Sequence, residues 1–421
     1  MLMGLARVRS CFMASTRLLS PYLVAPLAAL AACGGRLADL PADACTASPC
    51  DSVADASDAA MPDATLEAAV EPAIDASDTP DAAHGDTSPN DGGVAPGEAV
   101  PPGPPSTAAT GGATRWFVVK KFLLGTELQD GTRSADAWQT LGYDLDGRDT
   151  TASDSRTNTN TCQRFAGSPS AVLADGVGGR DDNFGSHIMQ MLVQLQPNAE
   201  DSFNQQIAGG GTTWLLRLDN VGAPDNANVP GALYETAPLG TRPPPRWDGT
   251  DSFPVLTTSL VDGSSLDQPK VVFLGGYMTG GTWVSGAAPM RAQFSFGMGS
   301  GSADLPIEGA IFSFPTSTTG ASPSGVFAGV MRATAAQDAL GVLAQAYGIC
   351  PGGPIFGQMS SIVSQAVDLV MGAPQYQDVN VTCDSISIGL GLYVAPAQPP
   401  STVFPPPPPP PSQCAPSGTG G

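Results

Sequence analysis

The sequence predicts a mainly β domain, antiparallel and sandwich-like, with a packed helical hairpin and a disordered N-terminal linker. Three observations support this fold class. Short runs rich in aromatic and β-branched residues recur between clusters of Gly, Pro, Asp and Ser, as strands do between turns. Two of these runs, Gln293–Phe296 and Ala310–Phe314, alternate polar and apolar residues, which is typical of half-buried strands. Helical periodicity is confined to two regions of the chain.

The predicted strands lie between residues 116 and 395. Many short strands joined by glycine-rich turns favour a sandwich or a barrel-like pair of sheets. The expected strands are Trp116–Leu124, Thr212–Asn220, Gly231–Thr236, Lys270–Met278, Met290–Phe296, Ile307–Phe314, Gly325–Arg332 and Asp378–Ala395.

The two regions with helical spacing differ in length. In the shorter region, apolar residues recur at helical intervals from Phe184 to Leu195, ahead of Pro197. In the longer region the same spacing occurs on both sides of Cys350–Pro354, a run that breaks helices. We therefore expect one helix at 184–195 and a helical hairpin over 333–371, packed on the sheet.

The segment 33–114 is rich in Ala, Asp and Pro and strongly acidic. Its residues 34–114 contain 14 acidic side chains and a single basic one, Arg36. Such a composition buries too little apolar surface to offset the entropy of ordering, so we expect a disordered linker. A flexible coil of this length spans roughly 50 Å, enough to hold the β-rich domain at 115–398 away from the N-terminus.

The C-terminal segment 399–421 is rich in proline and contains the unbroken run Pro405–Pro411. A proline run of this length adopts the polyproline II conformation and measures roughly 20 Å. We interpret it as a stiff surface extension, and docking into an aromatic groove is the alternative.

The N-terminus has the features of an export signal. Three arginines, Arg7, Arg9 and Arg17, precede the uncharged apolar stretch Leu18–Ala32. The stretch ends in Leu30-Ala31-Ala32-Cys33, which resembles the lipobox of bacterial lipoproteins. The resemblance covers about the first 35 residues and assigns 1–32 as a signal peptide.

The lipoprotein resemblance implies that Cys33 becomes the acylated N-terminus of the mature chain. Two or more acyl chains anchor a protein stably, so the membrane is the partner that the signal implies. Gly34 follows the cysteine in place of the aspartate that signals inner-membrane retention in this class, which favours the outer membrane of a bacterial cell envelope.

The chain has 39 acidic and 18 basic residues, a formal net charge of −21. The negative field of such a chain repels nucleic acids and anionic lipid surfaces, so we expect no nucleic-acid partner. An envelope protein or a glycan stays open as the partner.

The chain has eight cysteines, of which Cys11 lies in the expected signal and Cys33 is the expected lipidation site. Six cysteines remain. An even number of cysteines in an exported protein predicts disulfides, and no Cys-x-x-Cys pair suggests zinc. Spacing pairs Cys45 with Cys50, the hairpin favours Cys350 with Cys383, and elimination then pairs Cys162 with Cys414. The connectivity stays open at this stage.

One acidic loop is a candidate calcium site. Asp144, Asp146 and Asp149 alternate with other residues around Gly147, and Asp181 lies in a second acidic, glycine-rich stretch. Calcium prefers six to eight hard oxygen ligands, which such aspartates can supply. The loop departs from the EF-hand pattern, and the alternative is a pair of polar turns with Asp182 or Asn183 capping the following helix.

No catalytic motif accompanies the few residues that could do chemistry, so we expect no enzyme activity and no organic cofactor. His187 is the only histidine of the predicted domain and lies on an apolar helix face. Glu235 and Glu308 fall on predicted strands and would face one cleft in a two-carboxylate carbohydrate hydrolase. Trp247 is the tryptophan expected to be exposed, as in a sugar platform, although core packing is the favoured role of all five tryptophans.

Together these features predict a membrane-anchored envelope lipoprotein that displays a non-catalytic β-rich binding or structural domain. A β-sandwich hydrolase acting on carbohydrate and a calcium-stabilised adhesin-like module are the two alternatives.

Overall fold

The computed structural model describes residues 99–151, 161–164, 173–263, 265–294, 303–317, 324–346, 348–408 and 413–414. The expected signal peptide, Cys33, Cys45, Cys50 and the linker up to residue 98 lie outside the described residues. Among the residues that are described, no helix combines the length and the apolar character needed to cross a bilayer.

Ordered structure begins earlier than the expected boundary at residue 115. The backbone amides of Ala109 and Gly112 donate to the side-chain oxygens of Asn226 and Asn220. The carbonyl of Ala99 accepts from the amide of Asp144 at 2.7 Å. Residues 99–114 therefore belong to the folded domain, because their backbone groups are satisfied by it.

The expected antiparallel β fold is confirmed. One large sheet has the strand order β6-β4-β3-β1-β13-β11-β10-β8-β7, with β9 paired to β10, and every neighbouring pair in it is antiparallel. Its strands are β1 Ala113–Leu123, β3 Trp214–Val221, β4 Gly231–Glu235, β6 Val271–Phe273, β7 Tyr277–Thr279, β8 Thr282–Val284, β9 Ala288–Phe294, β10 Ala303–Pro315, β11 Ser324–Arg332 and β13 Ser385–Ala397.

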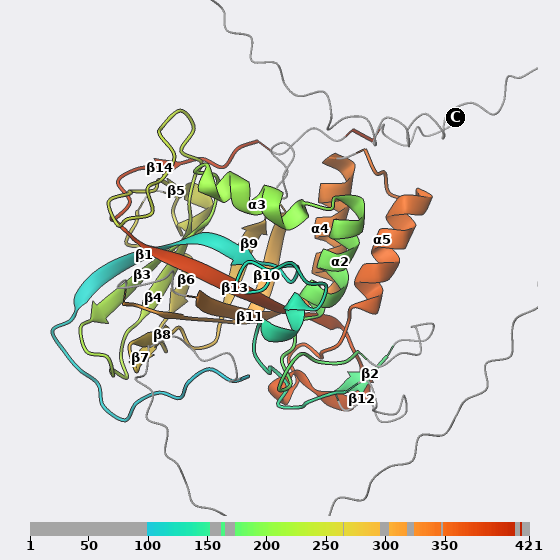
Figure 1. Cartoon of the computed structure of the whole chain (residues 1–421), viewed down its shortest axis with the longest axis horizontal. Helices are drawn as coiled ribbons and strands as arrows, with labels where there is room; N and C mark the ends of the chain where they lie inside the picture. Colours follow the sequence, from blue (N-terminus) through green and yellow to red (C-terminus); the bar gives the residue numbers. More distant parts are fainter. Residues whose placement is uncertain are drawn as a thin grey trace, which may run out of the picture. The chain divides into compact units, whose positions relative to one another are not determined.

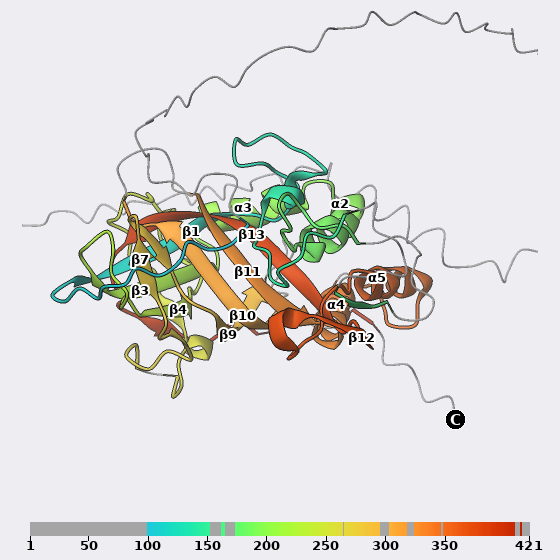
Figure 2. The ribbon, with the colours of Figure 1, turned by 90° about the horizontal axis from the view of Figure 1, so that it is seen from below.

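The layers come from one sheet that curls on itself rather than from two separate sheets. Figures 1 and 2 show the long strands β10, β11 and β13 crossing the domain, with β1, β3 and β4 curving away from them. The curl brings edge strand β6 close to β9. Strand twist accumulates across a sheet of this width, which bends it towards closure.

Two small parallel pairs attach chain segments to the domain. Strand β2 (Cys162–Gln163) pairs with β12 (Asp378–Thr382), and β5 (Val255–Leu256) pairs with β14 (Val403–Phe404). The segment Asp378–Ala395, expected as one strand, is thus divided between β12 and β13. The segment Lys270–Met278 is likewise divided between β6 and β7.

The expected hairpin is confirmed as α4 (Ala333–Ala346) and α5 (Pro354–Gln365), which lie side by side in Figures 1 and 2. Pro354 occupies the first turn of α5, where its missing N–H costs no hydrogen bond. The helix expected at 184–195 is a π-helical turn, η3 (Phe184–Met189), continued by α2 (Gln190–Leu195). The sequence did not indicate α3 (Ala199–Ala208), which packs on β1. Short 3-10 turns complete the helices: η2 Ala137–Thr140, η4 Thr257–Ser259 and η5 Pro374–Tyr376.

The central strand β1 is buried on both faces along much of its length. Phe117 and Val119 of β1 belong to the main core, whereas Val118 between them belongs to a second cluster with Tyr234 and Phe253. This alternation follows from the two-residue period of a strand. The main core is lined with aromatic rings, and Trp214 makes an edge contact with Phe312 at 5.4 Å between centroids.

Candidate metal centre

Three aspartates from two segments of the chain come together next to β13. One carboxylate oxygen each from Asp144, Asp146 and Asp181 lies within 4.8 Å of the others. Asp146 and Asp181 are only 1% and 2% exposed, and Asp144 is half-buried. The structure therefore assembles three of the four aspartates that the sequence indicated as calcium ligands.

Hydrogen bonds to the backbone hold these carboxylates in place. Asp144 Oδ1 accepts from the amides of Gly147 at 2.6 Å and Arg148 at 3.2 Å, while Asp146 Oδ1 accepts from the amide of Arg148 at 2.9 Å. Asp181 Oδ2 accepts from the amides of Leu145 and Asp146 at 2.6 and 3.3 Å. The bonds of Asp144 and Asp146 are local and shape the loop itself, whereas those of Asp181 tie the two segments together.

Two glycines permit the close approach of the two segments. Gly147 has a φ of +75°, a left-handed conformation that glycine adopts without strain. Gly179, at φ +82°, lies so close to the first loop that a Cβ would stand 2.6 Å from the carbonyl oxygen of Arg148. A side chain at Gly179 would push the loop with Asp181 away from the loop with Asp144.

Asp149 is not part of the group. It is exposed, and its charge adds only a little to the raised pKa of Asp144, which comes first from burial. Asp182 serves the structural role that the sequence offered as the alternative: its Oδ1 accepts from the amides of Gly185, in the first turn of η3, and Gly389 on β13, both at 2.9 Å.

Two further aspartates, Asp175 and Asp368, are close enough for their charges to act on Asp181. Burial raises the pKa of Asp175 to about 8, and the charges of Asp146 and Asp368 add to the shift. Burial also raises the pKa of Asp368 to about 6, against the hydrogen bonds that Ser387 donates to it. The pKa of Asp181 is raised well above its usual range by burial first and then by the charges of Asp146, Asp175 and Asp368.

These groups fit a hard divalent cation. Calcium binds oxygen ligands at 2.3–2.6 Å, so two ligands on opposite sides of one ion stand about 4.8 Å apart. The three carboxylate oxygens satisfy that limit. A cation between them would offset both the mutual repulsion of the carboxylates and the cost of burying them. Calcium would draw its remaining ligands from carbonyl groups and water.

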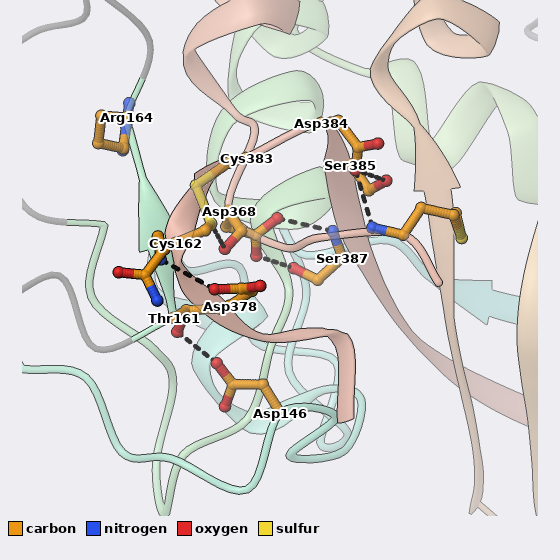
Figure 3. The surroundings of a disulfide bond; sticks show 12 residues. Asp146, Thr161, Cys162, Arg164, Asp368, Asp378, Cys383, Asp384, Ser385 and Ser387 are labelled. Carbon is orange, nitrogen blue, oxygen red and sulfur yellow. Dashed lines mark hydrogen bonds between the residues drawn. A yellow bond between two sulfur atoms is a disulfide. The ribbon is translucent and has the colours of Figure 1, made fainter. Parts of the chain in front are cut away.

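A disulfide lies next to the three aspartates. The pairing of the cysteines differs from the expected one. Cys162 is bonded to Cys383, and Cys350 to Cys414. The expected Cys350–Cys383 and Cys162–Cys414 pairs are wrong, because β2 lies beside β12 and the C-terminal segment returns to the loop before α5. Figure 3 shows the hydrogen bond that the hydroxyl group of Thr161, next to Cys162, donates to Asp146 Oδ2.

The C-terminal tail is consequently attached to the domain rather than projecting as a free extension. Strand β14 pairs with β5, and Cys414 is bonded to Cys350. Of the expected proline rod, residues 409–411 lie outside the described part of the chain.

The two glutamates proposed as a hydrolase pair line one cavity. Glu235 on β4 and Glu308 on β10 share a cavity of about 440 Å³ with Lys270 and Arg291. Glu235 is 7% exposed, whereas Glu308 is exposed at the surface. The structure thus brings the pair together but places two cations in the same cavity.

His187 and the tryptophans occupy structural positions. His187 is half-buried in η3, with Nδ1 hydrogen-bonded to Ser186 Oγ at 2.7 Å, and burial and the charge of Arg164 lower its pKa. Trp247 is half-buried and stacks on Phe253 at 5.5 Å between centroids, so the expected exposed ring is wrong. It packs against both hydrophobic clusters, so core packing accounts for its position.

Sequence reasoning missed Asp368 as a member of the charged cluster, and it included Asp175 only as part of the second acidic stretch. Asp175 lies in the acidic stretch before Asp181, and the acidic composition of that stretch is the only sequence signal for it. Asp368 stands alone in the apolar run from Ala366 to Val370, and a lone charge in such a run is the signal that could have found it.

The chain matches no protein-family model, and no curated protein or solved structure shows significant similarity to it.

Proposed function

We propose that this protein is a lipid-anchored component of a bacterial cell envelope whose non-catalytic β-rich domain is stabilised by calcium and serves in binding or structure. The observation that carries the calcium part is the meeting of Asp144, Asp146 and Asp181, two of them buried, with one carboxylate oxygen of each within 4.8 Å of the others. The lipobox-like run ending in Cys33 supports the anchor.

Calcium fits the setting that the anchor implies. Extracellular calcium modules bind the ion with dissociation constants of about 0.1–1 mM, which suits a site with few protein ligands. Buried disulfides such as Cys162–Cys383 persist in the oxidising compartments where lipoproteins are displayed. The ion would join two segments of the domain that the sequence separates by about 35 residues.

The calcium proposal is tested by thermal unfolding of the protein in EDTA and in 10 mM calcium. At 10–100 times the dissociation constant, binding to the folded state alone adds about 1–3 kcal/mol to the free energy of unfolding. We expect a clear rise of the melting temperature with calcium and a smaller one with magnesium, which demands a more regular octahedral geometry. An identical transition in EDTA and calcium would refute the site.

The anchor is tested separately with Cys33→Ser. We expect the variant to move from the membrane fraction to the soluble fraction, because the thiol that would carry the first acyl chain is gone. Cys11→Ser, in the expected signal, is the matched control and should leave the protein in the membrane fraction. Membrane recovery of Cys33→Ser equal to that of the control would contradict lipidation at this residue.

A further inference from the structure

The proline-rich tail is attached to the domain on both sides of its proline run. On the N-terminal side, Val403 and Phe404 form strand β14, which pairs with β5. On the C-terminal side, Cys414 is bonded to Cys350, in the loop between α4 and α5. A segment that is held at both ends does not project from the domain, so reach into solvent does not account for the prolines.

The prolines that follow β14 are open to solvent. Pro405–Pro408 are exposed, and Phe404 before them is 43% exposed. Within the described part of the chain, no group donates a hydrogen bond to a carbonyl of Pro405–Pro408. These carbonyls are therefore available as acceptors, as they are along a polyproline II helix, which has no internal hydrogen bonds.

The tail also differs from the rest of the chain in charge. Residues 399–421 contain no acidic and no basic side chain, whereas the whole chain has a net charge of −21. A charged partner would find no complementary charge on this segment. The surface that the segment offers consists of consecutive proline rings, free carbonyl groups and the half-exposed ring of Phe404.

A groove lined with aromatic side chains is the surface that fits these groups. Flat aromatic rings pack on proline rings, and polar groups on such rings donate to the carbonyls between them. Proline fixes φ near −65°, so the segment loses little conformational freedom when it is bound. Its two attachments to the domain restrict it further.

We propose that Phe404–Pro408 is a recognition segment for a partner protein whose binding groove is lined with aromatic side chains. The prolines would lie in the groove in the polyproline II conformation, with their carbonyls accepting hydrogen bonds from it. The ring of Phe404 would fix the direction of binding, because it marks one end of an otherwise uniform run. The proposal depends neither on the calcium site nor on the lipid anchor.

The test uses an isotope-labelled EVH1 domain as the probe, because domains of this type bind proline-rich segments in an aromatic-lined groove. The full chain and a free peptide with the sequence of residues 401–412 are titrated into the domain, and NMR follows the amide signals of the groove. We expect both to shift these signals, and the full chain to bind at least as tightly as the peptide. Binding of the peptide alone would show that the segment is covered in the folded protein. That result, or binding of neither, would overturn the proposal.

Matched variants of the full chain locate the contact. Pro406→Ala/Pro407→Ala lies beyond β14 and should weaken binding about tenfold or more, because a few central contacts supply most of the binding energy. Pro243→Ala/Pro244→Ala, in a second exposed proline run, is the control and should leave the affinity unchanged. Undiminished affinity in the tail variant, or an equal loss in the control, would refute the assignment to the tail.

Discussion

At the scale of single residues, the role of each aspartate follows from its surroundings rather than from its place in an acidic stretch. Asp181 and Asp182 are neighbours in sequence, yet Asp181 lies in the candidate metal centre and Asp182 caps η3. Asp149 belongs to the same loop as Asp144 but is exposed. The direction of each side chain decides whether the aspartate is a candidate ligand, a helix cap or a surface charge.

This difference predicts a contrast between Asp181→Asn and Asp149→Asn. An asparagine at 181 can still accept from Leu145 but offers no charge to a cation. In EDTA we expect Asp181→Asn to be at least as stable as the natural protein, because it removes a carboxyl group whose charged form is disfavoured by burial and by the neighbouring aspartates. In calcium it should lose most of the stabilisation of about 1–3 kcal/mol.

Asp149→Asn is the control and should keep the full calcium response. Melting curves of both variants with and without the ion provide the measurement. A calcium response in Asp181→Asn as large as in the natural protein would remove Asp181 from the ligands.

At the scale of elements, β2 and β12 connect the Cys162–Cys383 disulfide to the candidate metal centre. The Cys162–Cys383 bond joins residues 221 positions apart and fixes Thr161, whose hydroxyl donates to Asp146. The other bond, Cys350–Cys414, ties the tail to the loop before α5. The Cys162–Cys383 bond therefore positions a residue that contacts Asp146, whereas the Cys350–Cys414 bond positions the C-terminal segment.

Replacing both Cys162 and Cys383 by Ser should lower the free energy of unfolding by about 2–5 kcal/mol, as removal of a native disulfide does in secreted domains. It should also weaken calcium binding, because Thr161 is no longer held against Asp146. The Cys350→Ser/Cys414→Ser double variant is the control: its calcium affinity, measured by titration, should match that of the natural protein. Equal calcium affinities in the two double variants would show that the Cys162–Cys383 disulfide does not support calcium binding.

At the scale of the whole molecule, the buried carboxylates link stability to pH. The pKa of Asp175 is about 8 and that of Asp368 about 6, both above the usual value of 3.8. The folded state without calcium thus holds protons that the unfolded chain releases, so its stability falls as pH rises from about 4 to about 8. Bound calcium displaces those protons and favours the charged form.

We therefore expect the melting temperature in EDTA to fall between pH 6 and pH 8, and the gain from calcium to grow over the same interval. Asp175→Asn should flatten the pH dependence in EDTA, because this residue has the higher of the two pKa values. Differential scanning calorimetry at several pH values measures both effects. A stability in EDTA that rises between pH 6 and pH 8 in the natural protein but not in Asp175→Asn would contradict the assignment.

The sequence by itself determined the antiparallel β class, the α4–α5 hairpin and most strand positions, because apolar periodicity records which side chains face a core. It also indicated Asp144, Asp146 and Asp181, because calcium chemistry needs dense oxygen ligands. Only the tertiary structure decided that one sheet curls on itself, that Cys162 pairs with Cys383, and that the charges of Asp175 and Asp368 act on Asp181. Those features join residues far apart along the chain, and local pattern has no information on which distant segments become neighbours.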